Sequence, residues 1–147
     1  MKLEDLEQQT RISATTLSNE RMTSEDAEAE VREIVFEIDG GDFDFAPGQS
    51  IGIITPGPHD LGHDEHFRLY SIADIPGSDE SGRPRVTIAV RRVSYIDDYS
   101  GERFKGVSSN YLCDLKPGDR VTMTGPYGYA FEVPEDHGAN LILIGAG

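Results

Sequence analysis

Three polar side chains that could bind a ligand lie close together in the stretch HFRLYSIAD, residues 66–74. Arg68, Tyr70 and Ser71 supply a guanidinium, a phenol and a hydroxyl to an otherwise largely apolar segment. Because successive side chains of a strand point to opposite faces, Arg68 and Tyr70 would share one face and Ser71 would lie on the other. This pattern indicates a strand at the edge of a binding site. The alternative is a surface strand with one solvated arginine.

A second group of polar residues follows in KGVSSNYLCDLKPGD, residues 105–119. We predict a short helix with Ser108 or Ser109 as its N-cap, because serine side chains accept hydrogen bonds from the first backbone N–H groups of a helix. The free N–H groups and hydroxyls at its start would accept an anion, above all phosphate. The alternative is a helical turn that closes one end of a barrel. The Lys116-Pro117-Gly118 sequence would end the helix, and its apolar face would comprise Tyr111, Leu112 and Leu115.

The remaining reactive side chains could act as metal ligands or as nucleophiles. His59, His63 and His66 are spaced by four and three positions in HDLGHDEH, so the first two would share a helix face and could bind zinc. Two prolines precede this stretch and Gly62 interrupts it, so we predict a solvated loop and no metal site. Cys113 lies beside leucines in the predicted helix and is interpreted as structural. The serines of the two segments above lie in no G-x-S-x-G motif, which argues against hydrolase chemistry.

Composition excludes several classes of protein. The 147 residues suit one domain, and 27 Asp plus Glu against 13 Lys plus Arg give a net charge of −14. Such an acidic chain lacks the basic face that nucleic acids require, and anionic membrane surfaces would repel it. Its single cysteine allows no internal disulfide and favours a reducing compartment. The sequence contains no apolar run near the ~20 residues of a membrane span and no signal peptide, so we expect a cytoplasmic protein.

Short apolar runs separated by Gly and Pro would position these polar groups. Alternating apolar residues predict a strand at 31–38. Many short strands with turns at this spacing favour an antiparallel barrel or sandwich. Residues 1–16 are interpreted as a weakly packed arm or short helix, and the charged residues 18–30 as a turn-like segment. Further strands are expected at 50–55, 85–93 and 119–125.

An uninterrupted apolar run, NLILIGAG, occupies residues 140–147. Continuous hydrophobicity is typical of a parallel strand that is covered on both faces. Glycines directly after such a strand begin the phosphate-binding turns of nucleotide domains. We therefore interpret this run as the first strand and glycine turn of a second domain, of which the rest does not follow in this sequence.

The order of six motifs resembles that of the plant-type ferredoxin–NADP reductase family. The motifs are PGQSIGII (47–54), RLYSIA (68–73), AVRRV (89–93), GVSSNYLCDLKPGD (106–119), GPYG (125–128) and LILIGAG (141–147). The resemblance implies a mainly β protein, an antiparallel flavin-binding β-barrel with one short capping helix, followed by an NAD(P)-binding α/β domain. It divides the chain into an arm (1–16), the FAD-binding barrel domain (17–138) and the start of the second domain (139–147).

The resemblance also gives the polar groups roles in binding FAD. Arg68 would pair with the pyrophosphate through charge-assisted hydrogen bonds worth about 1.5–3 kcal/mol each. Tyr70 would lie against the isoalloxazine ring, and Ser71 would be the catalytic residue near flavin N5. Tyr95 would stack on the adenine, and Arg91 would meet the nicotinamide nucleotide. The implied cofactor-binding residues are Arg68, Leu69, Tyr70, Ser71, Ala89, Val90, Arg91, Tyr95, Gly106, Val107, Ser108 and Ser109.

The implied function is that of an FAD-dependent NAD(P)H oxidoreductase. NADP or NAD would exchange hydride with FAD, which would exchange electrons with a one-electron acceptor such as ferredoxin or an oxygenase component. The acidic balance of the chain argues against ferredoxin, which is itself usually acidic, and favours another acceptor. The alternative is a non-catalytic flavin-binding or regulatory module of a multidomain complex. Because most of the second domain is absent, these residues alone are expected to be inactive.

Overall fold

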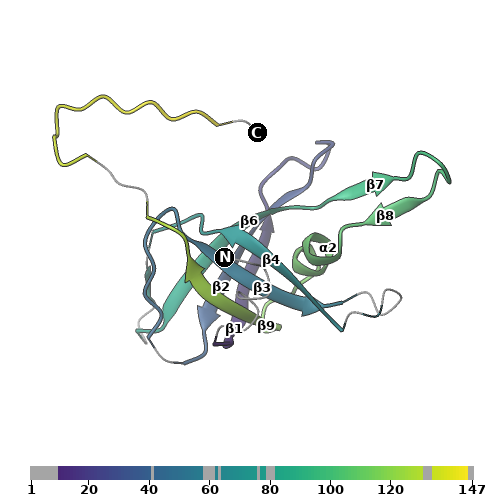
Figure 1. The fold of residues 1–147 in the computed structure, drawn as a ribbon, viewed down its shortest axis with the longest axis horizontal. Coiled ribbons are helices and arrows are strands. Elements are labelled where there is room, and N and C mark those ends of the chain that lie inside the picture. Colours follow the sequence, from purple (N-terminus) through teal and green to yellow (C-terminus); the bar gives the residue numbers. More distant parts are fainter. Residues whose placement is uncertain are drawn as a thin grey trace.

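A single antiparallel sheet forms most of the molecule described by the computed structural model (Figure 1). The described residues are 10–40, 42–57, 62, 64–75, 77–78, 82–130 and 134–145. In chain order, the elements are β1 (Ile12–Arg21), β2 (Val31–Ile38), β3 (Ser50–Pro56), β4 (Glu65–Ser71), β5 (Gly77–Ser78), β6 (Pro84–Arg91), β7 (Ser94–Ile96), β8 (Arg103–Lys105), α2 (Val107–Cys113) and β9 (Arg120–Tyr127). The sheet order is β4-β3-β9-β1-β2-β6-β5, and β7 and β8 form a separate hairpin.

The sheet closes into a barrel because β4, at one end of the sheet, meets β6, next to the other end. Ile72, directly after β4, forms an antiparallel bridge with Ile88 of β6, and the Ala73 N–H donates to the Thr87 carbonyl at 2.8 Å. Closure of this kind removes the long unpaired edges of an open sheet. The predicted antiparallel barrel is therefore confirmed. Beyond the bridge, β4 and β6 share no ladder in the described part of the sheet, so the seam between them is open on one side.

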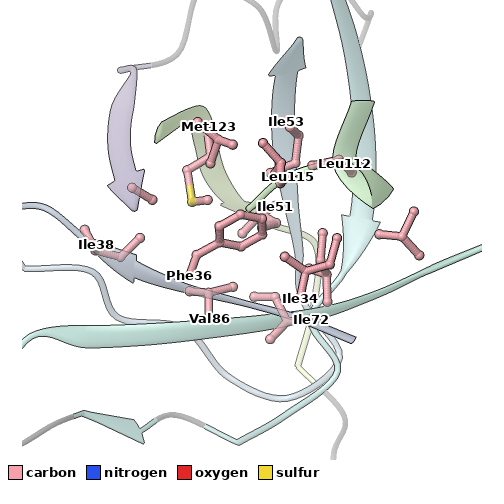
Figure 2. Packing of buried hydrophobic residues seen from close by; sticks show 14 of the residues in the cluster. Ile34, Phe36, Ile38, Ile51, Ile53, Ile72, Val86, Leu112, Leu115 and Met123 are labelled. Atoms are coloured by element: carbon pink, nitrogen blue, oxygen red, sulfur yellow. The ribbon is translucent and has the colours of Figure 1, made fainter. Parts of the chain in front are cut away.

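The barrel interior is filled by side chains that alternate along the strands (Figure 2). In β2, Ile34, Phe36 and Ile38 are at most 1% exposed, as the alternation at 31–38 predicts. Each fully buried side chain of this size contributes about 1.5–3 kcal/mol relative to exposure. Helix α2 adds its own apolar residues to this core and is thereby held at one end of the barrel. The same core contains Ile51, Ile53, Ile72, Val86, Leu112, Leu115 and Met123.

Five predicted strands form, as β2, β3, β4, β6 and β9, whereas β1 occupies residues for which the sequence predicts an arm and a turn. The interpretation of 1–16 as a weakly packed arm and of 18–30 as turn-like is wrong for Ile12–Arg21, which pairs with β2 on one side and β9 on the other. The inward residues Ala14 and Thr16 are 0% and 1% exposed. One is small and the other polar, so β1 lacks the apolar alternation by which a strand is recognised.

Helix α2 forms where predicted, but its start differs. Its N-cap is Gly106, and no side chain caps its first N–H groups, so the prediction of Ser108 or Ser109 as N-cap is wrong. Both serines lie within the first turn and are buried. The helix ends at Cys113, before the predicted Pro-Gly stop. No helix in the part of the chain that the structure describes is long and apolar enough to cross a membrane.

The apolar run at the end of the chain forms no strand in the described residues. Residues 141–145 pair with no part of the sheet, and Figure 1 shows them outside the barrel. Leu141, Ile142, Leu143 and Ile144 are 61–94% exposed. The predicted strand is therefore not formed here, where no neighbouring strand satisfies its backbone groups. The assignment of 139–147 to a second domain stays a prediction, and residues 146–147 lie outside the described residues.

Candidate functional site

The open seam of the barrel forms a groove beside helix α2, which we call the β4–α2 groove. One wall comes from β4, and the other comes from the end of β6, Val93 and the first turn of α2. The groove has a volume of about 290 Å³. Because β4 and β6 separate beyond the Ile72–Ile88 bridge, no ladder fills this opening. Its lining residues are His66, Arg68, Leu69, Tyr70, Arg91, Val93, Gly106, Val107, Ser108 and Ser109.

Arg68 and Tyr70 line the groove together, as the alternation along β4 predicts. Arg68 is exposed and makes no ion pair with the described residues, so its guanidinium can bind a ligand. Tyr70 packs partly against the barrel core. Burial raises the pKa of its phenol, and the opposing effects of a hydrogen bond with Ser108 and of the Arg68 charge are smaller. The phenol therefore stays neutral at physiological pH.

The hydroxyls of the two serines in α2 bind other parts of the barrel. The Ser108 and Thr55 hydroxyl oxygens are 3.3 Å apart in a buried contact. Ser109 Oγ accepts a hydrogen bond from the Val93 N–H at 3.2 Å. These contacts explain why neither hydroxyl caps the helix. The first N–H groups of a helix have no acceptor within it, so the backbone of this turn remains able to donate to an anion.

Four of the predicted cofactor-binding residues do not line this groove. Ser71 ends β4 and is exposed, and Ala89 is exposed on β6. The Val90 side chain is 1% exposed within the core, so only its backbone could border a ligand. Tyr95 lies in the β7–β8 hairpin, where its ring stacks on Phe104 with 5.4 Å between centroids and 20° between planes.

A second groove adjoins the first and contains residues that the sequence did not single out. This hairpin groove has a volume of about 550 Å³ and shares Arg91 and Val93 with the β4–α2 groove. Arg103 comes from β8, where it pairs with Ile96 of β7. Nothing in the sequence indicates that Arg103 lines a groove, because its position depends on the pairing of β7 with β8. The other lining residues are Glu28, Ala29, Arg92, Ser94 and Ile96.

Glu30, in the loop before β2, pairs with Arg92, which lines the hairpin groove. Its carboxylate accepts hydrogen bonds from Arg92 Nε at 2.7 Å and from Arg32 Nη1 at 3.1 Å. The bond from Arg92 is the largest of the effects that hold the pKa of Glu30 below its usual range, although partial desolvation opposes it. The carboxylate is therefore charged at neutral pH and paired with two guanidinium groups.

This lowered pKa predicts acid sensitivity of the fold. The unfolded chain takes up a proton on Glu30 at higher pH than the folded chain, so the stabilisation is complete at neutral pH and is lost as the pH falls through the folded pKa. Urea unfolding of wild type and Glu30→Gln should give different stabilities at about pH 7 and converging ones below about pH 4. A difference in unfolding free energy between the two proteins that stays constant from about pH 7 to below about pH 4 would contradict a lowered pKa of Glu30.

The histidine-rich stretch gives no support for a metal site. His59 and His63 lie outside the described residues, whereas His66 lies in β4 and lines the groove. Within the described ranges, no group of His, Cys, Asp and Glu side chains could hold a metal ion. Cys113 is buried, and burial raises the pKa of its thiol. These features agree with a packing role for the cysteine.

Comparison with known proteins finds relatives over most of the chain. A ferredoxin–NADP reductase from Spirulina sp. is 41% identical over 131 residues, which are 89% of this chain and 45% of that protein. The cyanelle ferredoxin–NADP reductase of Cyanophora paradoxa is 44% identical over 129 residues, which are 88% of this chain and 35% of that protein. The chain thus spans less than half the length of these relatives. No protein-family model matches it.

Solved structures show the same fold. A ferredoxin-NADP+ reductase from Plasmodium falciparum, solved with 2'P-AMP, matches with a TM-score of 0.62 and 22% sequence identity. The match covers 86% of this chain and 42% of that one. At this identity the likeness establishes the fold alone, and it agrees with the barrel and short helix described above.

Proposed function

We propose that this chain, which belongs to the plant-type ferredoxin–NADP reductase family, is the FAD-binding part of an NAD(P)H-dependent flavoprotein oxidoreductase. The observation that carries the proposal is the β4–α2 groove. It brings together an arginine that makes no ion pair with the described residues, a tyrosine ring and the start of a helix, all from residues expected to bind the cofactor. A non-catalytic flavin module would use the same groove, and no feature of the described residues favours it.

The residues of the groove fit a dinucleotide diphosphate. Arg68 would bind the diphosphate, because a guanidinium forms paired, charge-assisted hydrogen bonds with phosphate oxygens. Backbone N–H groups of residues 107–109 would donate from the opposite wall. Gly106 lets this wall pack closely, since a Cβ there would lie 2.8 Å from Ser109 Oγ and 3.2 Å from the Val93 carbonyl oxygen.

The aromatic residues would hold the two ring systems of the cofactor. Tyr70, half-buried against the core, would pack on the isoalloxazine and shield it from water. Tyr95 would stack on the adenine, and because Phe104 covers one face of its ring, only the opposite face would be free. The two adjoining grooves share Arg91 and Val93, so an extended dinucleotide could occupy both. When bound, FAD supplies hydride and single-electron transfer, and Ser71 remains the proposed contact near N5.

Charge near the grooves supports anionic partners. Arg68, Arg91 and Arg103 line them in a chain whose net charge is −14. A local positive region attracts phosphates and acidic surfaces even on an acidic protein. We therefore propose NADP or NAD as the hydride partner, and ferredoxin or an oxygenase component as the electron acceptor. A cytoplasmic location stays a prediction, and some relatives, such as that of Arabidopsis thaliana, are named as chloroplastic.

Titration of the purified chain with FAD tests this proposal. Quenching of flavin fluorescence should reveal one saturable site, and Tyr70→Ala should weaken binding about tenfold by removing the ring contact. Tyr99→Ala is the matched control, because Tyr99 is fully exposed and lines neither groove. A folded chain that does not quench FAD fluorescence would contradict the proposal.

A further inference from the structure

Arg92 binds side chains from two separate parts of the chain at once. Its Nε donates to Glu30 Oε2, in the loop before β2, at 2.7 Å. Its Nη1 donates to Asn110 Oδ1 at 3.1 Å, and its Nη2 donates to Asp114 Oδ1 at 2.9 Å, both at α2. The Arg92 side chain is 27% exposed and that of Glu30 is 22% exposed. A planar guanidinium can hold such a set of acceptors, whereas a lysine ammonium lacks the fork.

Asn110 links Arg92 to the wall of the β4–α2 groove. Its Nδ2 donates to the Val93 carbonyl at 2.9 Å and to the Gly106 carbonyl at 2.7 Å. The Gly106 N–H also donates to the Val93 carbonyl, at 2.9 Å. Val93 and Gly106 both line the groove. The contact between Arg92 and Asn110 therefore lies directly behind this wall.

Glu30 also reaches the other end of the helix. Arg32 donates from Nη1 to Glu30 Oε1 at 3.1 Å and from Nε to Asn19 Oδ1 at 2.6 Å. Asn19 Nδ2 in turn donates to the Leu112 carbonyl at 3.0 Å and the Leu115 carbonyl at 2.8 Å. The same amide also donates to the carbonyl of Cys113, the last residue of the helix, at 3.3 Å, so it supplies a donor where the helix has none left within it. Glu30 thus connects both ends of α2 to the barrel through two arginines.

A helix as short as α2 depends on such contacts. It has seven residues, whereas isolated helices become stable only near ~12–15 residues. Leu112 and Cys113 bury its inner face, which fixes its depth in the barrel. Hydrophobic burial has no preferred direction, whereas hydrogen bonds weaken steeply with angle. The polar contacts therefore determine how the first turn of α2 faces the groove.

We propose that Arg92 and Glu30 are positioning residues for the cofactor site: they hold the first turn of α2 opposite Arg68, at the separation that a bound diphosphate requires. Glu30 lines neither groove and Arg92 lines only the hairpin groove, so both act on the diphosphate site through their contacts with α2. The inference rests on the proposed FAD-binding function and extends it to residues behind the groove.

The test measures FAD affinity and fold stability separately in the same variants. Arg92→Gln keeps one amide donor group but cannot bind Glu30 and both helix side chains together, so the FAD Kd should rise about tenfold in protein that is fully folded. The absorption spectrum of bound FAD should also change, because the wall would move relative to the ring system. Arg92→Lys should restore the Kd only partly, because it restores the charge without the fork. Loss of stability alone would lower the melting temperature without changing the Kd of the folded fraction.

Arg83→Gln is the matched control. Arg83 precedes the same strand, β6, and forms an ion pair with Glu37 at 3.0 Å away from both grooves. This variant should keep the wild-type Kd and spectrum. If Arg92→Gln does not fold, the same comparison is made with Glu30→Gln, for which a similar rise in Kd is expected.

Two negative outcomes are distinguishable. If wild type binds FAD, and folded Arg92→Gln or Glu30→Gln binds it with the same Kd and spectrum, this inference is overturned and the proposed function stands. Wild type that does not bind FAD would overturn the proposed function and this inference with it.

Discussion

Replacing Arg68 with alanine is expected to weaken FAD binding by about a hundredfold, the largest effect of any side chain in the groove. Arg68 is the one arginine on the β4 wall, and it makes no ion pair with the described residues. Charge-assisted hydrogen bonds to phosphate contribute about 1.5–3 kcal/mol each, and two of them would account for the loss. The variant should fold normally, because the Arg68 side chain is exposed and makes no ion pair with the described residues.

The measurement is a fluorescence titration with FAD at two salt concentrations. Arg68→Lys should recover part of the affinity, since it keeps the charge but loses the paired geometry. Arg120→Ala serves as control, because Arg120 pairs with Asp39 at 3.0 Å and lines neither groove. Equal affinity of Arg68→Ala and wild type would show that the diphosphate does not bind at this wall.

Replacing Gly52 with alanine is expected to destabilise the barrel by about 3 kcal/mol. Gly52 lies in β3 between β4 and β9. A Cβ at this position would lie 2.3 Å from Phe67 Cε2 and 2.5 Å from Thr124 Oγ1. Both neighbours are buried, and Phe67 packs in a small cluster with Ile54 and Tyr127 that would have to open. Because Phe67 belongs to β4, the same change should also disturb the groove wall.

Urea unfolding of Gly52→Ala and Gly40→Ala provides the comparison. A Cβ on Gly40 would have nothing within 4 Å, so that variant should stay within about 0.5 kcal/mol of wild type. Similar unfolding midpoints for both variants would contradict the close approach of β3 to its neighbours. The pair also separates steric crowding from the general effect of replacing glycine in an unfolded chain.

The strand at 31–38 could be predicted with its correct bounds because large apolar side chains alternate along it. β1 could not, because its buried positions are occupied by Ala14 and Thr16, whose burial depends on pairing with β2 and with the distant strand β9. The apolar run near the end of the chain shows the opposite case. Its hydrophobicity predicts a buried strand, but the described residues provide no partner, and it lies exposed. The composition of a segment indicates which secondary structure it favours, and the elements that pack against it determine whether it is buried.

The site was predictable where it follows from local periodicity. Arg68 and Tyr70 share a groove wall because they are two positions apart on one strand. The sequence predicts Ser108 or Ser109 as a helix cap, but their hydroxyls bind Thr55 and Val93 instead. These partners could not be predicted, because they come from other parts of the chain. The same limit applies to Arg92, which follows the groove residue Arg91 in sequence. Its contacts with Glu30 and α2 exist only once the barrel has closed.

The most direct test of the central claim is a crystal structure of this chain with FAD. The account predicts the two phosphates between the Arg68 guanidinium and the backbone N–H groups of residues 107–109, with the isoalloxazine on Tyr70. FAD bound elsewhere on the barrel, or with its phosphates away from Arg68, would contradict it.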